Sequence, residues 1–173
     1  MSARANLELK ARYTDLTEAR RRSLELGAEP AAVEEQVDTY YRVPTGRLKL
    51  RCVSGSPALL IAYHRPDQLA TRRSSYTLVP VAEPGLLHEA LTVTLGLLGE
   101  VRKRREILLW HNIRIHLDEV SSLGNFVEFE AVLAAAEPEE LSHRRLAVLV
   151  ETLGIAATDT VAAGYAHLLG FEP

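Results

Sequence analysis

The chain has 173 residues, a formal net charge of -3 and a single cysteine, Cys52. A chain of this length can bury a sizeable core, and one cysteine cannot form an internal disulfide bond. A slightly acidic chain is not the composition of a general nucleic-acid binder, which is usually basic overall. No apolar run approaches the ~20 residues needed to span a bilayer, and no signal-peptide pattern is found. We therefore expect one domain over residues 1–173 in the cytoplasm, with no nucleic-acid or membrane partner.

Four segments have the spacing and end signals of helices: residues 16–26, 85–98, 138–153 and 159–169. The first has both ends marked, because Asp15 and Glu18 form a capping-box pair and Gly27 supplies a stop. Each of the other three is also followed by a glycine. The rest of the chain is predicted to be mostly strand, with turns near residues 44–46, 54–57 and 123–125.

The predicted strands have one apolar and one ionic face. Alternate residues of a strand share a face, so Asn6, Glu8 and Lys10 lie on one side of the first strand, opposite an apolar side. Later strands show the same division. Their ionic faces carry Arg47, Lys49, Arg51, Lys103, Arg105, Arg114, His116, Asp118, Glu128 and Glu130.

An ionic strand face has two explanations. The plain one is a half-buried antiparallel sheet whose polar side faces water. Against it, like charges at alternate positions, as in Arg47, Lys49 and Arg51, repel one another unless an anion lies between them. Clustered carboxylates such as Glu128 and Glu130 are costly unless a cation neutralises them, and oxygen ligands suit Mg²⁺ or Mn²⁺. The pattern therefore favours a surface that binds a metal–phosphate complex.

Six short motifs, in order along the chain, resemble the motif series of the CYTH superfamily, the triphosphate tunnel metalloenzymes. They are NLELK at 6–10, GRLKLR at 46–51, YHRP at 63–66, VRKRRE at 101–106, RIHLDEV at 114–120 and GNFVEFE at 124–130. The ending GYAHLLGF at 164–171 is similar to the bacterial class IV adenylyl cyclase branch. The resemblance implies an α+β fold with a closed eight-stranded antiparallel β-barrel, the triphosphate tunnel, and helices packed outside it.

The resemblance also implies a role for particular residues. Those expected to bind Mg²⁺ or Mn²⁺ are Glu8, Glu128 and Glu130, with Asp118 as a further candidate. Those expected to bind the triphosphate are Lys10, Arg47, Lys49, Arg51, Arg65, Lys103, Arg105 and Arg114, of which Lys10, Arg65, Lys103 and Arg105 are the expected catalytic residues. One position departs from the family's E-x-E-x-K signature. Asn6 replaces the first glutamate, so the metal site loses one negative charge.

The leading functional hypothesis is a divalent-metal-dependent phosphohydrolase that acts on inorganic triphosphate or a nucleoside triphosphate. One alternative is a class IV adenylyl cyclase, which converts ATP to cyclic AMP and pyrophosphate. Another is a non-catalytic module that binds triphosphate or polyphosphate, which the loss of charge at Asn6 favours. A third is a structural barrel with a solvated lumen. Whether the chain forms a homodimer is left open.

Overall fold

The computed structural model describes residues 4–64, 72–133 and 138–171. Most of its strands are joined directly to the next strand, and the helices come after β1, β5 and β8. In chain order they are β1 (Arg4–Arg12), α1 (Leu16–Glu25), β2 (Glu29–Tyr41), β3 (Arg47–Val53), β4 (Ala58–His64), β5 (Arg72–Val81), α2 (Pro84–Leu95), β6 (Leu97–Trp110), β7 (Ile113–Val120), β8 (Gly124–Val132), α3 (Glu139–Leu153), the 3-10 helix η1 (Ala157–Asp159) and α4 (Tyr165–Leu168).

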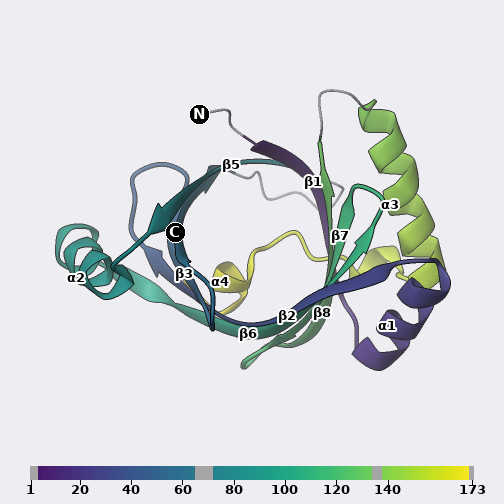
Figure 1. Ribbon diagram of the computed structural model, residues 1–173, viewed down its shortest axis with the longest axis horizontal. Coiled ribbons are helices and arrows are strands. Elements are labelled where there is room, and N and C mark those ends of the chain that lie inside the picture. Colours follow the sequence, from purple (N-terminus) through teal and green to yellow (C-terminus); the bar gives the residue numbers. More distant parts are fainter. Residues whose placement is uncertain (1–3, 65–71, 134–137, 172–173) are drawn as a thin grey trace.

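Every strand pairs with two antiparallel neighbours, and the strands form a ring (Figure 1). The order is β1-β5-β4-β3-β2-β6-β7-β8, and β8 pairs again with β1, so the sheet closes on itself as a barrel. α1 and α3 pack outside one part of the ring, on β7 and β8, whereas α2 packs on β2 and β3. The expected α+β class with eight antiparallel strands is confirmed.

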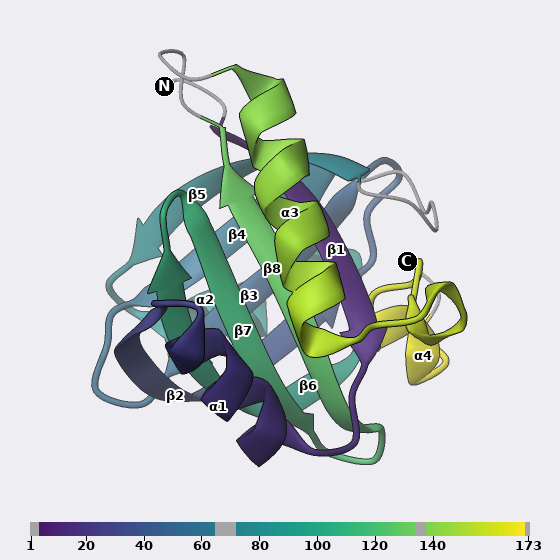
Figure 2. The same ribbon diagram turned by 90° about the vertical axis from the view of Figure 1, so that its right-hand side faces the viewer.

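Closure gives the two faces of each strand different surroundings. The outward apolar residues of β1, β7 and β8 form the main core with α1 and α3, and Figure 2 shows α3 running along these strands. Leu7, Ile115 and Phe129 are each at most 2% exposed and share this core with Leu146 and Leu149 of α3. Burying a side chain of this size contributes about 1.5–3 kcal/mol. Alternation along the strands then turns the ionic residues inward.

Local end signals place α1 and α3 well but misplace the end of α2. In α1, Asp15 accepts a hydrogen bond from the Glu18 backbone N–H at 3.0 Å, as the sequence predicts. α2 is shorter than the predicted 85–98, because it ends at Leu95 and residues from Leu97 onward pair with β2. Gly96, with a φ of 85°, makes the break between helix and strand. None of the helices in the described ranges is long and apolar enough to cross a membrane.

The predicted helix over residues 159–169 is wrong for most of its length. Only Tyr165–Leu168 is α-helical, and residues 160–164, which follow η1, form no helix. The reason is a backbone contact with β1. Thr160 bridges to Ala11, and the Val161 N–H donates to the Lys10 carbonyl oxygen at 2.8 Å. This tertiary pairing outweighs the helix propensity of the segment.

The C-terminal segment, residues 160–171, lies across one end of the barrel (Figures 1 and 2). Its Tyr165 is buried in a cluster with Val101 of β6 and Phe126 of β8. Its Phe171 packs so closely on Gly99 of β6 that a side chain at Gly99 has no room. The segment therefore joins β1 to β6 and brings a tyrosine to the barrel interior.

Candidate active site

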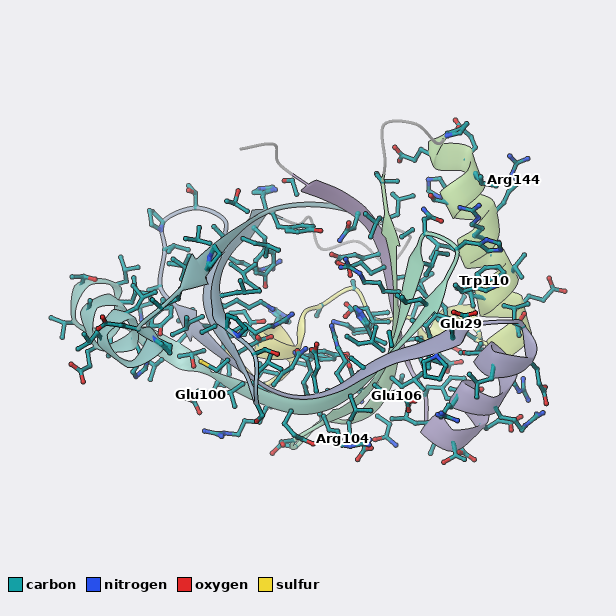
Figure 3. All side chains as sticks on the ribbon, viewed as in Figure 1. Glu29, Glu100, Arg104, Glu106, Trp110 and Arg144 are labelled. Carbon is teal, nitrogen blue, oxygen red and sulfur yellow. The ribbon has the colours of Figure 1, made fainter. Side chains whose placement is uncertain are left out.

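The inside of the barrel holds a cavity of about 530 Å³. Every strand contributes to its wall, as do Gly164 and Tyr165 of the C-terminal segment. The charged side chains that line it, together with one histidine, are Glu8, Lys10, Glu34, Asp38, Lys49, Arg51, Lys103, Arg105, Arg114, His116, Glu128 and Glu130. The residues that alternate with these along each strand point outward, as Figure 3 shows for Glu100, Arg104 and Glu106 of β6.

The structure brings most of the predicted site residues to this one cavity. They are Glu8, Lys10, Lys49, Arg51, Lys103, Arg105, Arg114, Glu128 and Glu130. Arg47 lies instead beside Tyr40 and Tyr63, next to the C-terminal segment. Asp118 is fully buried and does not line the cavity, but it accepts hydrogen bonds from Arg105, which does. Arg65 lies outside the described residues.

Asp38 of β2 pairs with three cations. Its carboxylate accepts hydrogen bonds from Lys49 Nζ at 2.9 Å, Arg51 Nε at 2.7 Å and Lys103 Nζ at 3.0 Å. The Asp38 residue is only 1% exposed. Burial alone would raise the pKa of Asp38, but Arg51, Lys103 and Lys49 hold this pKa well below its usual range. The carboxylate therefore stays charged and fixes three cations on one side of the cavity.

The two lysines bound to Asp38 are in surroundings that disfavour their positive charge. Burial, with a smaller effect from Arg51, lowers the pKa of Lys49 to about 7, although Asp38 opposes the shift. Burial likewise lowers the pKa of Lys103. Three cations therefore share one carboxylate in a buried place. A bound polyanion would favour the charged form of both lysines.

A second buried carboxylate, Asp118 of β7, holds Arg105. The Nε and Nη2 atoms of Arg105 donate to its two oxygens, each at 2.6 Å, and the Tyr165 hydroxyl donates to Oδ2 at 2.6 Å. Burial, followed by Asp118, raises the pKa of Tyr165 well above its usual range, so the hydroxyl remains a donor. The Tyr165 ring centroid also lies 3.7 Å from Lys10 Nζ. Asp118 and Tyr165 therefore position Arg105 and Lys10.

Glu128 of β8 shares Arg105 with Asp118. Its carboxylate lies 2.9 Å from Arg105 Nη2 and 3.4 Å from Lys10 Nζ. His116 Nδ1 lies 3.6 Å away, beyond hydrogen-bond length. Burial would raise the pKa of Glu128, but Lys10, His116 and Arg105 hold this pKa well below its usual range. Glu128 therefore stays charged among the cations of the lumen.

Glu130 of β8 and Glu8 of β1 are opposite each other in the strand pairing, and both line the cavity. Glu130 lies 3.2 Å from Arg114 Nη1 and accepts a hydrogen bond from the Asn6 amide. Asn6 in turn accepts one from the Tyr76 hydroxyl at 3.4 Å. Among the described residues, no three acidic, histidine or cysteine side chains already converge as a metal centre would. Glu8, Glu128 and Glu130 therefore line the same cavity, and each already interacts with other groups of the protein.

Sequence reasoning misses Asp38 and Tyr165. The signal for Asp38 is the alternation of Glu34, Gln36, Asp38 and Tyr40 along β2, all of which line the cavity. That signal is weak because the other face of β2 also carries polar residues. Nothing local indicates the role of Tyr165, since a tertiary contact between residues 160–161 and β1 brings it inward.

Asp38→Asn tests whether this carboxylate holds the cations in place. We expect the free energy of unfolding without ligand to fall by about 3–5 kcal/mol, because the change leaves buried cations uncompensated. Inorganic triphosphate should then raise the melting temperature more than in the wild type, since it replaces the lost charge. Melting curves across a triphosphate titration measure both effects. Glu35→Gln, on the outer face of β2, should change neither, and an Asp38→Asn protein of wild-type stability would contradict the assignment.

Tyr165→Phe tests the positioning of Arg105. The variant keeps the ring over Lys10 and loses only the hydrogen bond to Asp118. We expect its affinity for inorganic triphosphate, measured by calorimetry, to fall about tenfold, or about 1.4 kcal/mol. The matched control is Tyr13→Phe, which loses a 2.9 Å hydrogen bond to the Leu153 carbonyl oxygen outside the barrel. Equal affinities in the two variants would show that the Tyr165 hydroxyl matters only for stability.

Solved structures of similar fold are found in archaea, bacteria and plants. The PH1012 protein of Pyrococcus horikoshii OT3 is 24% identical, with 94% of this chain and 98% of that one covered and a TM-score of 0.83. A Vibrio parahaemolyticus protein proposed to be an adenylate cyclase is 17% identical, with 98% and 99% covered and a TM-score of 0.76. A Hippeastrum protein, also proposed to be an adenylyl cyclase and described as having a dominant triphosphatase activity, is 14% identical, with 97% and 94% covered and a TM-score of 0.66. At these identities the likeness shows a shared fold alone.

A family-level comparison goes further. No curated protein matches the chain. The family model of the CYTH domain, however, matches residues 4–165, which include all eight strands and Tyr165. The motifs, the strand order and this match agree, and the chain belongs to the CYTH domain family.

Proposed function

We propose that the chain is a divalent-metal-dependent phosphohydrolase that acts on a triphosphate bound in the barrel lumen. The observation that carries the proposal is a set of cations from three strands around one cavity: Lys10, Lys49, Arg51, Lys103 and Arg105. A linear triphosphate carries negative oxygens along its length, so it can contact cations of β1, β3 and β6 together. A single phosphate group is too short to use all of them.

Known proteins of the same fold support this reaction class. The Hippeastrum protein is described as having a dominant triphosphatase activity. Hydrolysis also has fewer structural requirements than cyclisation, because it needs only cations that hold the phosphates, a metal ion and water. We therefore place hydrolysis of inorganic triphosphate or a nucleoside triphosphate first among the candidate activities.

Glu8, Glu128 and Glu130 are the residues that would hold Mg²⁺ or Mn²⁺. Their carboxylates share one wall of the cavity and are oxygen donors of the kind that these hard cations bind. Asn6 adds an amide oxygen on the same strand face as Glu8. When bound, the ion would supply charge neutralisation and polarise phosphoryl oxygens. Asp118 is left out of this set, because it is fully buried and does not line the cavity.

The residues of the chain itself would position the phosphates and stabilise developing charge. In an in-line displacement, negative charge grows on oxygens around the transferred phosphorus, and cations fixed in advance stabilise it most. Lys103 and Arg105 are fixed in this way, since Asp38 and Asp118 hold them before any ligand binds. Water serves as the nucleophile, so the reaction requires no nucleophilic side chain.

Cyclisation of ATP is the second candidate, and the C-terminal segment favours it. Residues 164–171 resemble the class IV cyclase branch, and Gly164 and Tyr165 of this segment line the cavity. The Vibrio parahaemolyticus protein of similar fold is proposed to be an adenylate cyclase. Cyclisation demands that the ribose 3′-hydroxyl lie in line with the α-phosphorus, and such orientation is worth several powers of ten in rate. This added demand places cyclisation second.

Product analysis tests the proposal. The protein is incubated with ATP or inorganic triphosphate, each with Mg²⁺ and with Mn²⁺. We expect release of orthophosphate that EDTA abolishes. Lys103→Met should reduce kcat/KM by a factor of about 10–150, the equivalent of about 1.5–3 kcal/mol for one charge-assisted contact. Arg104→Met, the next residue along β6 on the outer face, is the matched control and should keep full activity.

Each other outcome of this assay identifies a different function. Cyclic AMP with pyrophosphate from ATP would replace hydrolysis by cyclisation. Tight triphosphate binding without any product would instead indicate a binding module. Failure of every triphosphate to bind would contradict the whole proposal.

Asn6→Glu tests the metal assignment by restoring the acidic residue of the family signature. Without metal, we expect a lower melting temperature, because the new carboxylate lies against Glu130 and the amide hydrogen bond is lost. With Mg²⁺ or Mn²⁺, we expect a larger rise in melting temperature than in the wild type and a lower metal concentration for half-maximal activity. Asn125→Glu, which adds the same charge at the start of β8, controls for net charge. An unchanged metal titration would exclude Asn6 from the metal site.

A further inference from the structure

The lysines of this chain all lie in the barrel lumen. The sequence has three of them, Lys10, Lys49 and Lys103, and each lines the central cavity. Apart from histidine, every other basic side chain is an arginine, including Arg104 on the outer face (Figure 3). An arginine stays protonated in proteins, whereas a buried lysine can lose its proton and become a nucleophilic amine. The side-chain amines of the chain are therefore gathered in the lumen.

Lys49 is the lysine most open to a molecule in the cavity. Its side chain is 12% exposed, whereas those of Lys10 and Lys103 are each 2% exposed. The Tyr165 ring lies over Lys10, with its centroid 3.7 Å from Lys10 Nζ. A reagent that enters the lumen therefore reaches the Lys49 amine more easily than either of the others.

The Lys49 amine is also partly uncharged near neutral pH. Burial, with a smaller effect from Arg51, lowers the pKa of Lys49 to about 7, although Asp38 opposes the shift. An exposed lysine has a pKa of about 10.4, so fewer than about one in a thousand such amines are neutral at this pH. Only the neutral amine has the lone pair that attacks a carbonyl carbon. Lys49 is therefore better prepared to act as a nucleophile than a lysine on the surface.

Three cation nitrogens meet at one carboxylate oxygen beside this amine. Asp38 Oδ2 accepts hydrogen bonds from Lys49 Nζ at 2.9 Å, Arg51 Nη2 at 2.8 Å and Lys103 Nζ at 3.0 Å. Arg51 lines the cavity and stays charged, so it can bind a phosphate group there. The atoms next to that phosphate then lie beside the Lys49 amine. A single phosphate does not extend to every cation of the lumen, so Lys49 is not required to neutralise it.

We propose that Lys49 is a site of covalent acylation by acyl phosphates, molecules in which a carbonyl carbon is bonded to a phosphate oxygen. Arg51 binds the phosphate, and the Lys49 amine attacks the carbonyl carbon. A carbon–nitrogen bond forms, and the bond from that carbon to the phosphate oxygen breaks with its electron pair on the oxygen. The amine proton passes to the phosphate, so the products are an amide and hydrogen phosphate.

Acylation of Lys49 changes the charge of the lumen. The amide is uncharged, so one of the cations proposed to bind a triphosphate is lost. The inference goes beyond the proposed function, because the reaction at Lys49 does not require any triphosphate to be hydrolysed.

Acetyl phosphate tests the inference in a variant that carries a surface lysine as an internal reference. Arg104→Lys introduces an amine on the outer face of β6, where the Arg104 side chain is 46% exposed. The variant is incubated with acetyl phosphate in EDTA near neutral pH, and peptide mass spectrometry follows acetylation of each lysine over time. We expect Lys49 to react at least about tenfold faster than the introduced lysine, because the neutral fractions differ by more than this factor. In the wild type, Lys10 and Lys103 are the slower references.

Phenyl acetate separates recognition of the phosphate from simple reactivity of the amine. It carries the same acetyl group on a good leaving group but has no phosphate. We expect the ratio of acetylation at Lys49 to acetylation at the introduced lysine to be about tenfold or more lower with phenyl acetate, because a charge-assisted contact is missing. Excess inorganic phosphate should slow the reaction of Lys49 with acetyl phosphate and leave that of the introduced lysine unchanged.

The outcomes separate this inference from the proposed function. Acetylation of Lys49 no faster than that of the introduced lysine would overturn the inference and leave the phosphohydrolase proposal intact. An equal ratio with phenyl acetate would also overturn it, since the phosphate would then contribute nothing. Selective acetylation of Lys49 by acetyl phosphate in a protein that hydrolyses no triphosphate would support the inference while the proposed function fails.

Discussion

The need to pair buried charge governs the rest of this structure. A cation removed from water is costly unless an anion accompanies it, and Asp38 and Asp118 meet this need while almost fully buried themselves. Both carboxylates belong to strands, so the cations they hold have fixed places on the barrel wall. An anion that enters the lumen does not have to order these side chains, which lowers the entropic cost of binding. The same carboxylates would compete with that anion, so an anion of high charge density would bind better than one with a single charge.

The features that can be predicted from the sequence are those with local causes. Strand alternation places Glu8 and Lys10 on the lumen face whatever the partner strands are, and Asp15 marks a helix start through its own side chain. Distant contacts determine the rest. The segment after Leu95 and the segment around Thr160 both leave the predicted helices because β2 and β1 supply backbone partners. Sequence patterns alone do not reveal such partners.

The same distinction explains which site residues can be found in advance. Cations at alternate positions of one strand form a visible pattern, and their convergence on one cavity follows once the barrel closes. A single carboxylate such as Asp38 is different, because its importance depends on the registers that bring Arg51 and Lys103 to it from two other strands. Membership of the CYTH family fixes the fold without fixing which phosphorus reacts. In the site proposed here, that choice depends on which phosphorus the cations of β1, β3 and β6 hold next to the carboxylates of β1 and β8.

The C-terminal segment, which joins β1 to β6 across one end of the barrel, bears on the order in which parts of the chain fold during synthesis. β1 leaves the ribosome well before its partners β8 and Thr160, which follow far later in the chain. Pairing between distant segments is slow, because loop-closure entropy must be overcome before contacts are gained. Tyr165 is made after all eight strands, so Asp118 obtains its hydroxyl partner only once the barrel can form. Completion of the proposed binding site is therefore expected to come late in the folding of this domain.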